Sequence, residues 1–261
     1  MTQPQYLFGD ADSAAQRLSV LARVYDESTR AFLSRAAGSA HFPLALDLGC
    51  GPGFTTQLIA DTLRCDRIIG FDSSRAFVHI ARANSAERVC FWEHDVTATP
   101  FPCTPADLVF SRFLLTHLHD PATQVAKWAT QVERRGLLLL EETETIHTSE
   151  PVFARYLQVV ETILAERSNH LYAGRIVRNL DSPGRLRSVF NEVCSVPVRN
   201  CDAARMFVLN LRTWQENEFV RSNYSIDSIL DLEQALQAIG DDESCCRDIA
   251  WDLRQAAWSK D

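Results

Sequence analysis

The chain has 261 residues, of which 46% are hydrophobic and 23% are charged. These proportions are ordinary for a domain with a full hydrophobic core, so they exclude disorder over most of the length. The net charge of −8 and the lack of any long Lys/Arg run argue against a nucleic-acid-binding surface, because phosphate neutralisation needs clustered cations.

The first residues, MTQPQYLFGDAD, have neither the basic nor the apolar segment of a signal peptide. No apolar stretch reaches the roughly 18 residues that a membrane span needs. We therefore expect a cytoplasmic protein without a membrane span. The eight cysteines are scattered, with no CxxC and no Cys/His pair at zinc-site spacing, so we expect reduced thiols and no metal.

The predicted elements alternate between helix and strand along the first half of the chain. Residues 10–35 place apolar side chains at helical spacing, which predicts an N-terminal helix. This rhythm predicts a parallel α/β sheet with right-handed crossovers, in which ligands bind at the carboxyl ends of the strands. The predicted strands after the first helix are residues 44–48, 67–71, 89–92, 107–110 and 137–140.

The alternation stops after Glu144. Residues 151–167 carry two apolar stripes, which predict a helix covered on more than one side, as a cap over a site would be. Residues 226–239 predict an amphipathic helix, whereas 204–214 fit a strand or a helix. The predicted units are an N-terminal helical arm or lid (1–40), an α/β core (41–145), a helical cap (146–190) and a C-terminal part that completes the sheet (191–261).

The first predicted strand runs into a glycine loop that reads DLGCGPG over residues 47–53. Its GxGxG spacing differs from the GxGxxG of dinucleotide enzymes, because Phe54 stands where their third glycine would be. The loop lets backbone approach a ligand without a phosphate clamp. Asp47 could face an ammonium group of that ligand. The alternative is an ordinary glycine-rich strand–helix turn.

Two further acids end the next two strands. Asp72 lies where a carboxylate can accept both hydroxyls of a ribose, and Asp95 lies where one can accept the amino group of adenine. The backbone N–H of Val96 would then meet a ring nitrogen. Loop and acids together predict a site for an adenosine that carries an amino acid.

The segments ALDLGCGPG, GFDSS, EHDVTATPF, ADLVFSRFLLTHLHDP and GLLLLEE resemble class I S-adenosylmethionine (SAM)-dependent methyltransferases. The small-molecule type, including the quinone-biosynthesis branch, is the most similar, and the resemblance covers residues 42–142. It implies a Rossmann-like, mostly parallel seven-stranded sheet with helices on both faces and a helical cap. It also implies SAM as cofactor, S-adenosylhomocysteine (SAH) as product, and methyl transfer to an O, N or C atom of a small molecule.

The resemblance extends to other segments. QYLFGDADSAAQRLSVLARVYDESTRAFL is similar to a leader whose tyrosine and helix residues fold over the cofactor, which implies contacts from Tyr6 and Arg17. The final AAWSK resembles the last strand of the family, which would make 204–220 a helix. Arg112 could also pair with a nearby acid. The cofactor site predicted in this way consists of Tyr6, Arg17, Asp47, Gly49, Cys50, Gly51, Asp72, Ser73, Asp95, Val96, Ser111, Arg112 and Phe113.

Three residues are candidates for catalysis. His117 follows the fourth strand and would accept a proton near neutral pH, although a histidine that packs a helix is the alternative. Glu142 and Glu144 share one side of the fifth strand and Glu141 faces the other. Glu142 and Glu144 could bind a cationic or hydroxyl-bearing acceptor or take its proton. The alternative is that they form a solvated strand end.

The sequence leaves the identity of the methyl acceptor open. Phe153, Tyr156, Tyr172 and Phe190 fit an aromatic or apolar small molecule, or the core of the cap itself. SRFL stands where methyltransferases of nucleic-acid bases or protein amides carry an NPPY-like tetrapeptide, which disfavours those substrates. A nicotinamide oxidoreductase and a non-catalytic SAM-binding protein are alternative functions. The oligomeric state is open too, with a homodimer as one option.

Overall fold

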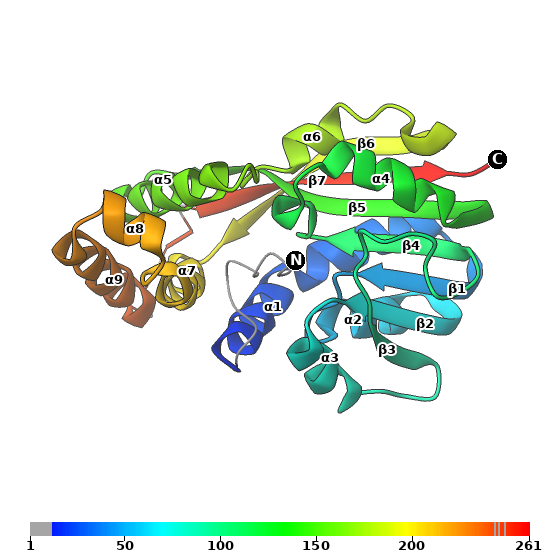
Figure 1. Cartoon of the computed structure of the whole chain (residues 1–261), viewed down its shortest axis with the longest axis horizontal. Helices are drawn as coiled ribbons and strands as arrows, with labels where there is room; N and C mark the ends of the chain where they lie inside the picture. Colours follow the sequence, from blue (N-terminus) through cyan, green and yellow to red (C-terminus); the bar gives the residue numbers. More distant parts are fainter. Residues whose placement is uncertain (1–11, 243, 245, 248) are drawn as a thin grey trace.

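The computed structural model describes residues 12–242, 244, 246–247 and 249–261. Its centre is a seven-stranded sheet in the order β3-β2-β1-β4-β5-β7-β6 (Figure 1). Strands β1 to β5 pair in parallel, and β7 is antiparallel to both of its neighbours. This confirms the predicted Rossmann-like, mostly parallel sheet. The strands are β1 (His41–Leu48), β2 (Arg64–Asp72), β3 (Val89–Glu93), β4 (Ala106–Arg112), β5 (Val132–Thr148), β6 (Arg187–Val198) and β7 (Ile249–Ser259).

Helices α3, α4, α5, α8 and α9 begin at a residue whose side chain caps the first turn. At the start of α4, for example, the Asp120 carboxylate accepts a hydrogen bond from Thr123 N, and Pro121 occupies the first turn. The α-helices are α1 (Asp12–Ala37), α2 (Phe54–Thr62), α3 (Arg75–Arg82), α4 (Pro121–Thr130), α5 (Pro151–Glu166), α6 (Gly174–Arg178), α7 (Asn200–Trp214), α8 (Glu218–Asn223) and α9 (Ile226–Asp241). Two short 3₁₀ helices are η1 (Leu115–His117) and η2 (Pro183–Arg185).

Both faces of the central strands are buried. Successive residues of a strand point to opposite faces, so each strand contributes side chains to two cores. Ala45, Phe110 and Leu139 pack in one core with α1, α2 and α3. Leu46 and Val109 pack in a second core, on the other face, with α4 and α6. The near-continuous apolar strands of the sequence follow from this double coverage.

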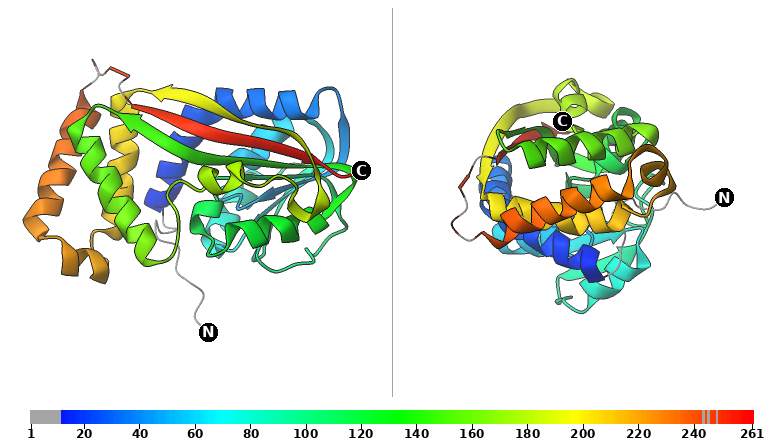
Figure 2. Two further views of the ribbon diagram at one scale, coloured as in Figure 1. Left: turned by 90° about the horizontal axis from the view of Figure 1, so that it is seen from above. Right: turned by 90° about the vertical axis from the view of Figure 1, so that its left-hand side faces the viewer.

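A third core lies beyond the carboxyl ends of β1 to β4. It joins α5, α7 and α9 to the far ends of β5, β6 and β7. In the left panel of Figure 2 these three strands run on past the rest of the sheet toward the helices. The strand predicted over 137–140 is therefore much longer in the structure, because its pairing with β7 continues to Thr148.

Two ambiguous segments are resolved by the structure. Residues 204–214 lie in α7, because Met206, Phe207 and Leu211 share its buried stripe. Strand β6 begins at Arg187, and much of it is exposed because it forms the sheet edge. No helix among the described residues is long and apolar enough to span a bilayer. The domain boundaries stay predictions.

Candidate functional site

A cavity of about 960 Å³ lies at the carboxyl ends of the central strands, between the sheet and the third core. We call its two ends the strand half and the helical half. The strand half is lined by residues 49–52, 72–74 and 95–97, which follow β1, β2 and β3. The helical half is lined from α1, α5, α7 and the extended ends of β5 and β7, by residues that include Arg17, Leu21, Tyr156, Phe207, Asn210 and Trp251.

The glycine loop brings bare backbone to the strand half. Gly49 and Gly53 have φ angles of 72° and 93°, and a Cβ on either would lie 2.8 Å from a neighbouring side chain. The amides of Gly49 and Cys50 both donate to the carbonyl of Phe71, at 2.8 and 2.9 Å. The loop is thus tied to the end of β2, and Gly49, Cys50 and Gly51 line the cavity.

Asp72 is held at the cavity rim by backbone. Its Oδ2 accepts from Gly51 N at 2.8 Å, and its Oδ1 accepts from Ser74 N at 2.8 Å. Ser73 lines the cavity beside it. Because two amides orient the carboxylate, its remaining lone pairs keep a fixed direction.

Asp95 and Val96 follow β3 and line the same half. Asp95 is exposed, and its Oδ1 accepts from the amide and the hydroxyl of Thr97, at 2.9 and 2.7 Å. The Val96 carbonyl accepts from Gln124 Nε2 and Trp128 Nε1, at 2.9 and 2.8 Å. These bonds anchor the loop to α4.

Asp47 and Ser111 do not line the cavity. Asp47 is buried under the glycine loop, where its Oδ2 accepts from the hydroxyls of Thr55 and Thr56, both at 2.6 Å. Burial raises the pKa of Asp47 to about 6, against the effect of these two hydroxyls. Ser111 is fully buried in β4. Any contact of either residue with a ligand stays a prediction.

Arg112 and Phe113 leave β4 and line the middle of the cavity. Arg112 Nη1 donates to Thr29 Oγ1 at 2.9 Å, and Thr29 in turn donates to Glu141 Oε2 at 2.6 Å. Burial lowers the pKa of Arg112, and the nearby acids Glu141 and Asp47 oppose that change. Phe113 has a φ of 54°, so the chain turns sharply into the loop that carries His117.

His117 and Arg17 lie close to each other on the cavity wall. Arg17 is buried and His117 is half-buried, and both line the cavity. Burial, and then the charge of Arg17, lowers the pKa of His117 to about 3. The imidazole is therefore neutral at pH 7.

Glu142 does not line the cavity, contrary to the expectation that it faces an acceptor. Its Oε1 accepts from the amides of Leu114 and Leu115, at 2.9 and 2.8 Å, while Oε2 is buried without a partner among the described residues. Burial raises the pKa of Glu142 to about 8. The side chain anchors the loop after β4, because its face of β5 is covered by that loop.

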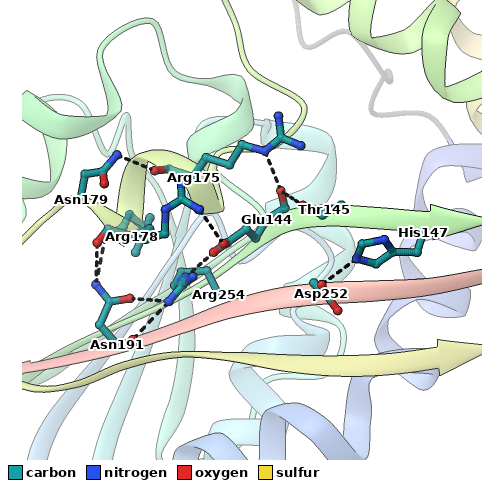
Figure 3. A network of polar contacts seen from close by, with 10 residues as sticks. Glu144, Thr145, His147, Arg175, Arg178, Asn179, Asn191, Asp252 and Arg254 are labelled. Carbon is teal, nitrogen blue, oxygen red and sulfur yellow. Dashed lines mark hydrogen bonds and ion pairs between the residues drawn. The ribbon is translucent and has the colours of Figure 1, made fainter.

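Glu144 does not line the cavity either, and Figure 3 shows its side chain among Arg178, Arg175 and Arg254. Its carboxylate pairs with Arg254 Nε on β7 and, at 3.4 Å, with Arg178 Nη1 on α6. Its carbonyl accepts from Arg175 Nε at 3.1 Å. The expectation of an acceptor-binding Glu144 is wrong in its placement, because α6 covers this side of β5. Arg254 Nη1 adds a bond to the Asn191 carbonyl at 3.2 Å.

Tyr6 lies outside the described residues. Several lining residues were not predicted, including Leu114, Asn210 and Trp251. The Leu114 side chain occupies the space that a Gly49 Cβ would fill, a contact that only the tertiary structure reveals. The other two come from α7 and β7, and no local pattern relates them to the strand ends.

A family model and curated relatives match only part of the chain in sequence. Residues 45–136 match the family model described as "Methyltransferase domain". A trans-aconitate 2-methyltransferase of Methylobacterium radiotolerans is 31% identical over 138 residues, 53% of this chain and 52% of that protein. Another from Rhizobium etli is 35% identical over 130 residues, 49% and 50% of the two chains. The chain thus spans about half the length of the curated relatives it matches.

Solved structures extend the likeness of fold over most of the chain. The cyclopropane synthase MmaA2 of Mycobacterium tuberculosis matches with a TM-score of 0.57 and 15% identity, covering 90% of this chain and 84% of that one. An N-methyltransferase of Haemonchus contortus, solved with SAH, matches with a TM-score of 0.52 and 17% identity, over 94% and 57%. These matches concern the fold alone.

Proposed function

We propose that this chain, a member of the class I SAM-dependent methyltransferases, transfers a methyl group from SAM to a carboxylate oxygen of a small organic acid. The proposal has two parts, the cofactor in the strand half and the acceptor in the helical half. The second part depends on the charges that line the cavity.

The strand half fits the cofactor. The backbone of Gly49, Cys50 and Gly51 lines this half, and Asp72 and Asp95 lie at the ends of adjacent strands with carboxylates held by backbone amides. Asp72 would hold the ribose hydroxyls, Asp95 and Val96 the adenine, and the glycine loop the amino-acid part. When bound, SAM supplies a methyl group already activated on a sulfonium.

One observation supports an anionic acceptor. Among the described residues that line the cavity, only Asp72 and Asp95 carry carboxylates, and both lie in the strand half. The helical half contributes the buried cation Arg17, which is 5% exposed, and Arg167 at the surface. A ligand carboxylate loses its water on entry, so it needs a charge of opposite sign inside the site.

The predicted base candidates do not suit proton removal, which supports the same acceptor. His117 has a pKa lowered to about 3 by burial and Arg17, far from the near-neutral value that suits a general base. Glu142 and Glu144 point elsewhere. A carboxylic acid is already ionised at pH 7 and needs no proton acceptor, because its pKa is about 4. The site then has only to align the acceptor oxygen with the methyl group.

The relatives agree with this proposal, since trans-aconitate, on which they act, is an organic acid. To test the proposal, the purified protein is incubated with SAM and a panel of organic acids, phenols and amines, and SAH release is measured. We expect SAH release with at least one acid and with no phenol or amine. Turnover of phenols or amines alone would reject the acceptor class, and binding of NADH without SAM would reject the cofactor.

A further inference from the structure

We propose that Thr29 is a positioning residue, which keeps the Arg112 guanidinium beside the glycine loop and apart from Glu141, so that Arg112 receives the carboxylate of the cofactor's amino-acid part. The inference rests on the proposed function. It makes the site selective for SAM and SAH over adenosine thioethers that lack this carboxylate. Thr29 itself lies on α1, is fully buried and does not line the cavity.

Arg112 is a buried cation with most of its donors unused. The residue is 8% exposed and lines the cavity. Among the described residues it makes one hydrogen bond, from Nη1 to Thr29 Oγ1 at 2.9 Å, and no ion pair. A guanidinium carries several N–H donors in a planar fork, and a buried charge is costly without a partner. The unused donors therefore suit an anion bound in the cavity.

Thr29 connects Arg112 to the buried acid Glu141 without letting the two pair directly. Its hydroxyl accepts from Arg112 and donates to Glu141 Oε2 at 2.6 Å. Glu141 Oε1 accepts from Gln255 Nε2 at 2.6 Å. Because both oxygens of the acid have donors, Glu141 is satisfied without taking the guanidinium. This arrangement leaves Arg112 available to a ligand.

The register of the sheet places Arg112 beside the glycine loop. Leu48 on β1 pairs with Ser111 on β4. Gly49 and Arg112, which follow them, therefore lie next to each other at the ends of the two strands. Burial lowers the pKa of Arg112, and nearby acids oppose this change, among them Asp47 under the glycine loop.

The strand order indicates which anion Arg112 would meet. The sheet runs β3-β2-β1-β4, so the ends of these strands lie side by side in that order. The proposed adenine, ribose and amino-acid positions follow β3, β2 and β1, and Arg112 at the end of β4 comes next. The amino-acid part of the cofactor carries a carboxylate, which a guanidinium can bind through two parallel hydrogen bonds. A ligand without that carboxylate leaves the cation with Thr29 alone.

Removal of the Thr29 hydroxyl should misplace Arg112 in a defined direction. Thr29→Val keeps the shape of the side chain, but Arg112 loses its hydrogen bond and Glu141 loses a donor. Two buried opposite charges then stabilise each other directly, which draws the guanidinium toward Glu141 and away from the glycine loop. Thr29→Ser keeps the bridging hydroxyl and is the matched control.

The test measures binding of two ligands to the full chain by calorimetry. One is SAH, and the other is decarboxylated SAH, in which a hydrogen replaces the carboxylate and the ammonium group remains. We expect the original chain to bind SAH about tenfold to a hundredfold more tightly, as charge-assisted hydrogen bonds do. Arg112→Met should remove most of this preference by weakening SAH alone. Thr29→Val should reduce it about fivefold or more, and Thr29→Ser should keep it.

Arg30→Met controls for charge, because Arg30 lies on the same helix, pairs with Asp26 at 2.7 Å and does not line the cavity. It should leave the preference for SAH unchanged. A merely structural role of Thr29 would weaken both ligands equally in Thr29→Val, and that result would overturn its positioning role, as would a full preference for SAH in this variant.

The outcomes separate this inference from the proposed function. If both ligands bind but the original chain does not prefer SAH, or if Arg112→Met keeps the preference, the carboxylate is not bound by Arg112 and the proposed function stands. If neither ligand binds the original chain, the proposed cofactor is wrong and this inference fails with it.

Discussion

The two halves of the cavity are built in different ways. The strand half is made by three short segments within residues 49–97, each directly after a strand of the parallel sheet. The helical half takes its residues from α1, α5, α7 and β7, which are spread over more than two hundred positions in the chain. Local sequence therefore sets which residues line the strand half, whereas tertiary packing sets which residues line the helical half.

This difference has a functional consequence. The backbone amides that hold Asp72 and Asp95 leave little freedom for side-chain change in the strand half. In the helical half, the lining is made by side chains on separate helices, so it can change while the fold persists. Variants should therefore divide into those that affect stability, cofactor binding or acceptor choice.

The largest effect is a loss of folding stability. We expect it outside both halves of the cavity, at the buried pair of Glu144 and Arg254. Arg254→Met leaves the Glu144 carboxylate with only Arg178 at 3.4 Å, and breaking a buried pair costs about 3–5 kcal/mol. Urea unfolding measures the loss, and SAH affinity of the folded fraction should not change. Arg187→Met is the control, because the exposed Arg187–Asp261 pair contributes at most about 1 kcal/mol. Equal stabilities of the two variants would show that Glu144 is not held as the structure shows.

The next largest effect is on cofactor affinity. Asp72→Ala removes the acceptor of Gly51 N and Ser74 N as well as the proposed ribose contact. Loss of charge-assisted bonds of about 1.5–3 kcal/mol weakens SAH binding by roughly one to two decades. Calorimetry checks this against Asp66→Ala, which changes an exposed carboxylate of the same strand that pairs with His41. Unchanged SAH affinity in folded Asp72→Ala would remove Asp72 from the site.

Two substitutions of Glu142 should separate its role as a hydrogen-bond acceptor from the effect of its charge. Glu142→Ala removes the acceptor of the Leu114 and Leu115 amides and should cost about 2 kcal/mol of unfolding free energy. Glu142→Gln keeps an oxygen for both amides. It should bind SAH and turn over acceptor as the original chain does, because Glu142 lies outside the cavity.

The pH dependence follows from the pKa of Glu142, raised by burial to about 8. Between about pH 4.5 and 8 the folded chain binds a proton that the unfolded chain releases, so this group stabilises the fold at low pH and the contribution disappears as pH rises. The slope is at most about 1.4 kcal/mol per pH unit. Glu142→Gln should remove it, and identical slopes for both proteins would contradict the burial of an ionisable Glu142.

The smallest effect concerns His117. Because burial and Arg17 lower its pKa to about 3, its ring signals in an NMR titration should not move between pH 8 and pH 5. The exposed His41 and His147 serve as internal controls in the same spectra. A His117 midpoint near pH 6.5 would restore it as a candidate base.

The parts of the site that the sequence predicted are those defined by strand ends. Gly49, Asp72, Asp95 and Arg112 each follow a strand of a parallel sheet, where topology alone brings residues to one edge. The α7 region was ambiguous, because its apolar residues fit two periods until the third core is assembled.

The errors have a common physical cause. Alternation along β5 correctly separates Glu141 from Glu142 and Glu144, but it does not say which face is covered. The loop after β4 and helix α6 cover the face that carries Glu142 and Glu144, so the cavity receives Thr143 instead. Tyr156 was predicted as a cap aromatic, but its stacking on Phe207 depends on the relative placement of α5 and α7.

The measurement that tests the central claim most directly is the chemical nature of the methylated product. The chain is incubated with SAM that carries a labelled methyl group and with the acid that gives the highest turnover. The labelled product is then analysed before and after treatment with mild alkali. A carboxylate acceptor predicts a methyl ester, so the label should leave as methanol in proportion to the SAH formed. A product that keeps its label in alkali would place the methyl on carbon, nitrogen or an ether oxygen, and would contradict transfer to a carboxylate.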